Sequence, residues 1–144
     1  MVRIWVGHAR RVVAVAILAM GAAACTDRLP EQDLRIVEAV PVERLSAALL
    51  WQDFETSRVQ AESNYNGKAV VIIGEVTGAG TDVPGDRYVY FKRTDSGGIR
   101  ANLLDDRASA VLAAVKDAPR ITLKCFCEGI SGADVVLKSC IAEP

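Results

Sequence analysis

The stretch "KAVVIIGEVTGAG" (Lys68–Gly80) decides how this chain folds. Its run of β-branched apolar residues predicts a strand, and Gly74 interrupts that strand. An isolated glycine inside a strand indicates a bulge or a sharp bend. A bend of this kind lets one long strand serve both halves of a small barrel. We therefore expect the rest of the sequence to supply the other strands of a barrel.

Four later segments alternate apolar and polar residues and are separated by turn-forming clusters, which predicts four more strands. They are "RYVYFKR" (Arg87–Arg93), "IRANLL" (Ile99–Leu104), "RITLKCFCE" (Arg120–Glu128) and "DVVLKSCIA" (Asp134–Ala142). The cluster "GISGA" joins the last two as a hairpin.

Two segments have helical periodicity. Residues 42–63 contain neither Gly nor Pro, and Leu45, Leu49 and Phe54 recur on one stripe, with Trp51 off it. Residues 105–119 repeat apolar side chains at helical spacing and end at Pro119. The order is helix, three strands, helix, two strands. We therefore predict a mainly β fold with two helices: a five-stranded Greek-key OB-fold barrel preceded by one helix, with the other between strands three and four.

The segment "MVRIWVGHARRVVAVAILAMGAAAC" (Met1–Cys25) runs from basic to apolar to small residues. This order is typical of a secretory signal peptide. Its apolar run is too short to span a bilayer, which needs about 20 residues. We expect residues 1–24 to be removed on export.

The signal ends in "GAAAC", which resembles the lipobox of bacterial lipoproteins, although Ala22 stands where Leu is usual. This resemblance predicts a lipid-modified Cys25 and an envelope protein that faces the periplasm. Thr26, in place of Asp after the cysteine, favours the outer membrane. The same small residues also satisfy an ordinary signal-peptidase site, which remains the alternative.

After removal of the signal, residues 25–41 read as a tether and residues 42–144 as one domain. The remaining chain has 14 basic and 18 acidic side chains, a formal charge of −4, which is a poor match for nucleic acid. His8, the one histidine, leaves with the signal, which excludes catalytic triads and His-ligated metals. We expect a protein that is not an enzyme and has no cofactor and no metal.

The segments "LWQDFETSRVQAESNYNGK" and "VVIIGEV" resemble the tRNA-anticodon-binding-like OB-fold family, which contains mostly uncharacterised bacterial exported proteins and lipoproteins. Phe54, Ala61, Tyr65, Gly67 and Lys68 fit the family pattern, whereas Ser57 stands in place of its usual Asn. In "CEGISGADVVLKSC", the closing cysteine pattern falls on Cys127, Gly129 and Cys140. The resemblance covers Val42 to Ala142. It implies the fold and no particular ligand.

The cysteines of the last hairpin are expected to form a disulfide, because exported proteins mature in an oxidising compartment. Cys125 and Cys127 share one face of their strand, and Cys140 lies on the neighbouring strand. A turn near Ser131 to Ala133 and one bulge favour a Cys127–Cys140 bond, with Cys125–Cys140 as the rival. The favoured pairing leaves Cys125 as a buried, inert thiol.

A possible ligand face is predicted on strands two and three, where OB-folds bind oligomers. Its residues are Tyr88, Tyr90, Lys92, Arg100 and Asn102. The leading interpretation is a non-enzymatic envelope lipoprotein that binds a protein or a glycan and is held to the membrane by its lipid. An oligonucleotide- or oligosaccharide-binding module and a thiol-redox protein are the alternatives.

Overall fold

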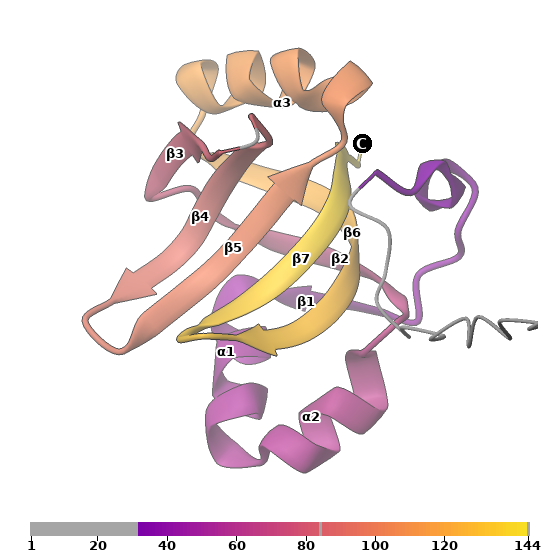
Figure 1. The fold of residues 1–144 in the computed structure, drawn as a ribbon, viewed down its shortest axis with the longest axis vertical. Coiled ribbons are helices and arrows are strands. Elements are labelled where there is room, and N and C mark those ends of the chain that lie inside the picture. The colour runs from indigo at the N-terminus through magenta and orange to yellow at the C-terminus, as the bar shows by residue number, and fades with distance from the viewer. Residues whose placement is uncertain (1–31, 84, 144) are drawn as a thin grey trace, which may run out of the picture.

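The fold is described from a computed structural model, in which residues 32–83 and 85–143 are placed. The predicted signal peptide, Cys25 and the first part of the tether lie outside these residues. Within them, no helix is both long and apolar enough to cross a bilayer. Figure 1 shows a curled sheet with α3 at one end and with α1 and α2 at the other.

The described residues form a mixed sheet, three α-helices and one short 3₁₀ helix. The elements are η1 (Leu34–Val37), β1 (Glu43–Ser46), α1 (Ala47–Thr56), α2 (Arg58–Tyr65), β2 (Ala69–Glu75), β3 (Gly78–Thr81), β4 (Arg87–Thr94), β5 (Gly97–Leu103), α3 (Asp105–Asp117), β6 (Arg120–Ser131) and β7 (Asp134–Ala142). The seven strands lie in the order β1-β2-β6-β7-β5-β4-β3. The pairs β1–β2 and β5–β7 are parallel, and the other pairs are antiparallel.

β2 and β3 follow each other in the chain but lie far apart in the strand order. β2 pairs with β6, whereas β3 pairs with β4. The two residues between them mark the change of partner: the Val76 amide donates to Pro119 O at 2.8 Å and the Thr77 amide to Tyr90 O at 2.7 Å. One run of chain therefore contributes to two distant parts of the sheet, as expected for the glycine-interrupted segment.

The role of Gly74 differs from the expected bulge. The pairing of β2 with β6 continues without a shift through Gly74, and the break comes at residues 76–77. A Cβ at Gly74 would lie 2.9 Å from Ala47 Cβ and 2.9 Å from Phe91 Cδ1. Glycine is therefore needed here because α1 and β4 approach the strand too closely for any side chain.

The expected single helix over residues 42–63 is instead a short strand and two helices. Ser46 ends β1 and caps α1, its hydroxyl accepting from the Leu49 amide at 3.1 Å. The helix therefore begins at residue 47 and not at residue 42. Its buried face also differs from the expected apolar stripe, because Trp51 is buried and Leu49 is exposed. Ser57 separates α1 from α2 and caps α2, accepting from the Gln60 amide.

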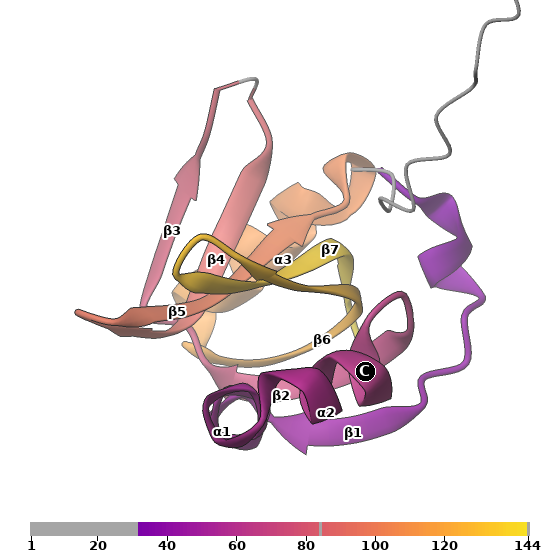
Figure 2. The same cartoon turned by 60° about the horizontal axis from the view of Figure 1, so that its bottom comes forward.

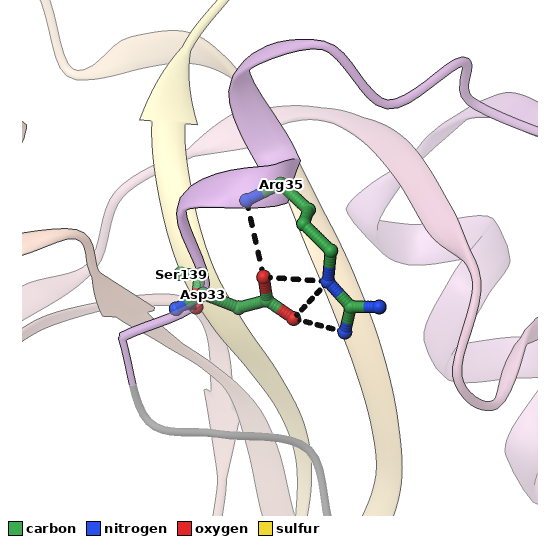
Figure 3. Close-up of polar contacts among 3 residues, drawn as sticks. All are labelled: Asp33, Arg35 and Ser139. Carbon is green, nitrogen blue, oxygen red and sulfur yellow. Dashed lines mark hydrogen bonds and ion pairs between the residues drawn. The ribbon is translucent and has the colours of Figure 1, made fainter.

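Residues 32–39, from here on the strap, lie against the outer face of β6 and β7 (Figure 2). The Asp33 amide donates to Ser139 Oγ at 2.8 Å, and the Asp33 carboxylate accepts from the Arg35 backbone and guanidinium (Figure 3). Lys124 Nζ donates to the carbonyl of Val37, the last residue of η1, and to that of Ala39 beyond it. The second part of the expected tether is thus packed on the domain.

A small apolar cluster lies beneath the strap. Ile36 is fully buried against Ala69, Leu104 and Phe126, outside the main core. The main core lies inside the curled sheet and is closed by α1, α2 and α3. The strap therefore gives the outer face of β6 and β7 its own hydrophobic packing.

Candidate functional site

Four of the five residues expected on the ligand face lie together on β4 and β5: Tyr88, Tyr90, Arg100 and Asn102. The antiparallel register sets Tyr88 opposite Asn102 and Tyr90 opposite Arg100. The residues that alternate with them belong to the buried core. The four side chains therefore project from the outer face of these strands, because successive residues of a strand point to opposite faces.

Arg100 lies over the ring of Tyr88. Its guanidinium carbon lies 4.2 Å from the centroid of the Tyr88 ring, within the range of a cation–π contact. The rings of Tyr88 and Tyr90 meet edge to face, with centroids 5.5 Å apart. Arg100 Nε also donates to Asn102 Oδ1 at 2.8 Å. These contacts hold the four side chains as one unit.

Asp82, in the loop between β3 and β4, pairs with the guanidinium of Arg100. The Arg100 and Asp82 side chains are 24% and 29% exposed, so a ligand can reach both. A partly exposed ion pair contributes little to stability, on the order of 1 kcal/mol or less. Its main consequence is electrostatic, because the Asp82 carboxylate neutralises the positive charge of Arg100.

Asp134, the first residue of β7 after the turn that joins it to β6, borders the same face. Its Oδ2 accepts from the Tyr90 hydroxyl at 3.0 Å, and its Oδ1 accepts from the Gly98 amide at 3.0 Å. Gly97, beside it, has φ +127°, and a Cβ there would lie 1.9 Å from Ala133 O. The turn is therefore locked against the β4–β5 hairpin through backbone that only glycine can adopt.

Sequence reasoning missed both carboxylates. Asp82 and Asp134 belong to "TDVPGD" and "GISGAD", whose composition indicates turns. Turn composition does not say where an aspartate side chain points. The one available signal was positional and concerned Asp82 alone, because its loop leads into β4, a strand of the predicted face.

Lys92 does not join the predicted face. The register between β4 and β5 shifts between Tyr90 and Arg93, so the alternation that placed Lys92 beside the tyrosines breaks there. Lys92 Nζ lies instead 6.0 Å from the centroid of the Trp51 ring, on α1. The prediction for Lys92 is therefore wrong.

The disulfide joins Cys125 to Cys140, which corrects the favoured Cys127–Cys140 pairing. Ser131 pairs with Asp134, so the turn consists of the two residues between them, one fewer than expected. The register between β6 and β7 shifts twice, between Cys127 and Gly129 and between Lys124 and Phe126, so that Cys127 pairs with Leu137 and Lys124 pairs with Ile141. Cys140, next to Ile141, therefore lies beside Cys125 and not beside Cys127. The Cα atoms of the bonded pair are 4.3 Å apart.

Cys127 is accordingly the free, buried cysteine, in place of Cys125. Burial raises the pKa of the Cys127 thiol from 9.0 to about 12. The thiol is therefore protonated at neutral pH, whereas a redox or nucleophilic cysteine needs a lowered pKa and access to solvent. Its Sγ lies 3.9 Å from Asn66 Oδ1.

The family-pattern residues near Tyr65 connect the end of α2 to α1 and to β6 through hydrogen bonds. The Tyr65 hydroxyl donates to Asp53 Oδ2 at 2.7 Å, tying α2 to α1. The Gly67 amide donates to Cys127 O, and Lys68 Nζ donates to two carbonyls at the end of α2. Ser57, where the family has Asn, caps α2, a position at which Asn and Ser serve equally well.

Over residues 32–83 and 85–143, no three His, Cys, Asp or Glu side chains lie close enough together to hold a metal ion.

The comparisons with known proteins agree with this architecture. The model of the tRNA_anti-like family matches residues 3–141, which is most of the chain, and the chain therefore belongs to this family. A search of curated proteins finds no match.

Among solved structures, the fold is similar to a crystal structure of a lipoprotein from Klebsiella pneumoniae subsp. pneumoniae, named as a candidate nucleic acid-binding protein. The TM-score is 0.51 at 18% sequence identity, over 78% of this chain and 98% of the Klebsiella chain. At this identity the similarity concerns the fold.

Proposed function

We propose that this chain is a lipid-anchored, non-enzymatic binding module of the bacterial cell envelope that faces the periplasm. The signal peptide and Cys25 motif support the anchor, as does the fold shared with a lipoprotein. The absence of histidine after residue 24 and the raised pKa of the Cys127 thiol support a role without catalysis.

The domain is proposed to be an OB-type barrel in which β2 and β3 are two halves of one bent strand. Five strands then remain, because β1 is an addition at the border of the sheet. The parallel pairing of β5 with β7 and the helix α3 between β5 and β6 support this assignment. In such barrels the outer face of the second and third strands binds ligand, which here means β4 and β5.

The ligand face is proposed to be the unit of Tyr88, Tyr90, Arg100 and Asn102, bordered by Asp82 and Asp134. One observation carries this proposal: the Arg100 guanidinium is stacked on Tyr88 and neutralised by Asp82 at a solvent-accessible site. Tyr90 and Asn102 are buried, so the groups that a ligand can reach are Tyr88, Arg100 and Asp82. An aromatic ring beside a paired donor and acceptor suits an uncharged, hydrogen-bonding chain such as an envelope glycan or a peptide. Two carboxylates at the border of the face oppose a polyanion.

A second candidate ligand is single-stranded nucleic acid. The stack of Arg100 on Tyr88 favours it, since aromatic and guanidinium planes are the platforms on which bases stack. The name given to the Klebsiella lipoprotein points the same way. This ligand would have to displace Asp82 from Arg100.

The test is binding of the purified, full-length protein in detergent to solubilised peptidoglycan fragments, envelope peptides and single-stranded DNA. Tyr88→Ala should weaken binding of the true ligand about tenfold, because stacking on an aromatic ring contributes about 1–3 kcal/mol. Lys92→Ala is the matched control, because Lys92 is on the same strand but away from the face. If both variants bind as the wild type does, the assigned face is wrong.

A further inference from the structure

The strap holds the domain close to the predicted anchor. Gln32 Nε2 donates to Leu103 O, and Gln32 Oε1 accepts from the Asp105 amide at 2.8 Å, the first helical residue of α3. Residue 32 is therefore packed on the domain. Six residues lie between Cys25 and Gln32, and seven peptide steps span at most about 25 Å even when fully extended.

An apolar edge lies directly beside this attachment point. Its members are Leu34, Val37, Val40 and Val42, with exposed fractions of 65%, 43%, 85% and 53%. Leu34 and Val37 are three residues apart on a 3₁₀ helix, so their side chains project from the same side. The segment from η1 to β1 forms one border of the molecule in Figure 2.

The charges along this border are few. The charged residues of the segment 32–46 are Asp33, Arg35, Glu38, Glu43 and Arg44, with a formal charge of −1. Arg35 is paired with Asp33 and Arg44 with Glu143, and the two arginine side chains are 75% and 51% exposed, so their apolar stems can lie along the interface while the valines contact acyl chains.

We propose that the edge formed by Leu34, Val37, Val40 and Val42 rests on the lipid bilayer, so that the domain lies against the membrane in a fixed orientation. This inference depends on the anchor in the proposed function. A tether of at most about 25 Å keeps the edge near the bilayer, and burial of exposed apolar side chains in the interface favours contact.

The test uses the full-length protein, processed and acylated in cells, reconstituted into vesicles of phosphatidylethanolamine and phosphatidylglycerol. Val40→Trp places a fluorescent reporter on the edge. Val59→Trp is the matched control, because Val59 is 80% exposed but lies on α2, away from the strap. The wild type, with its buried Trp51, gives the baseline.

Lipids brominated on their acyl chains should quench the reporter at position 40 at least about twofold more than the reporter at position 59, because interfacial side chains enter about 5–10 Å into the lipid boundary. Equal quenching at both positions overturns the proposal. Protection of position 40 from a soluble quencher without lipid quenching also overturns it, since a protein surface, such as a second copy, would then cover the edge.

Mass spectrometry of the same preparation separates the two proposals. A mature chain without acyl groups at Cys25 refutes the anchor in the proposed function. An acylated chain with no preferential quenching at position 40 leaves the anchor intact and refutes the membrane-facing edge alone.

Discussion

Cys125 and Cys140 face each other across β6 and β7, and both are fully buried inside the curled sheet. Their bond closes a loop with a sequence separation of 15 residues around the last turn. Phe126, between the two cysteines of β6, points to the opposite face and packs under the strap. The disulfide therefore cross-links the hairpin on its core side, while Ile36 packs against its outer side.

Loss of the disulfide should destabilise the protein far more than loss of the free thiol. Cys125→Ala or Cys140→Ala should lower the free energy of unfolding by about 3 kcal/mol, the chain-entropy value for a loop of this length. Cys127→Ala should cost about 1 kcal/mol, the transfer and cavity cost of one buried atom.

Urea unfolding at neutral pH measures these differences, and alkylation of the unfolded, unreduced protein counts free thiols. In Cys127→Ala, the two remaining hairpin cysteines should resist alkylation. If they react, and the Cys125→Ala variant stays oxidised with wild-type stability, the bond joins Cys127 to Cys140 instead.

Gly74 should be intolerant of even a methyl group. Gly74→Ala should lower the free energy of unfolding by about 1–3 kcal/mol, because the new Cβ overlaps Ala47 and Phe91 and the core must shift. Gly78→Ala is the matched control: it lies in β3, and nothing is within 4 Å of its added Cβ. Chemical denaturation of both variants decides the matter, and equal stabilities would refute the close-approach explanation.

Releasing Arg100 from Asp82 should raise affinity for single-stranded DNA. Asp82→Asn leaves the guanidinium unpaired, which adds one phosphate contact and steepens the slope of log affinity against log salt by about 0.7. Asp95→Asn makes the same change of net charge in the exposed β4–β5 turn, away from Arg100. Fluorescence anisotropy over a salt series compares them, and an equal gain in both variants would mean that Arg100 does not contact the strand.

Stability should fall at alkaline pH. Burial raises the pKa of the Cys127 thiol to about 12, from 9.0, and burial and the Asp53 carboxylate raise the pKa of the Tyr65 hydroxyl to about 12, from 10.0. Since the folded pKa values are the higher ones, both groups favour the folded state below pH 9. This advantage is lost as pH rises toward 12, because the unfolded chain ionises first.

Urea midpoints measured from pH 8 to 11 under argon should therefore decrease, with the decline beginning near pH 9. Cys127→Ala should remove the part that begins near pH 9, and Tyr65→Phe the part that begins near pH 10. A decline that is unchanged in the double variant would contradict this assignment.

Much of the strand pattern could be predicted from sequence, because alternation and turn residues are local signals. The segments expected around Tyr88, Ile99, Leu123 and Val136 all lie in strands, and the helix expected over residues 105–119 is α3. The predicted boundaries of the elements were wrong where pairing between distant segments sets them. Val42 donates its amide to Ala69 O, which draws the expected helix start into a strand beside β2.

The site was harder to predict for the same reason. Tyr88, Tyr90, Arg100 and Asn102 follow from simple alternation, whereas Lys92 required knowledge of a register shift. The choice of disulfide partner depended on the length of the last turn and on two register shifts between β6 and β7, neither of which composition reveals. The strap was assigned as tether because its anchor points, Ser139 and Lys124, lie at the far end of the chain.

The pairing of β2 with β6 also governs the timing of folding. The first long strand to leave the ribosome cannot complete its ladder until the penultimate strand of the chain is available, because Val70 pairs with Cys125. Contacts of such wide sequence separation form slowly, so the newly made polypeptide stays unstructured for longer than one built from local hairpins. The domain therefore completes its native sheet only after almost the whole chain has been synthesised.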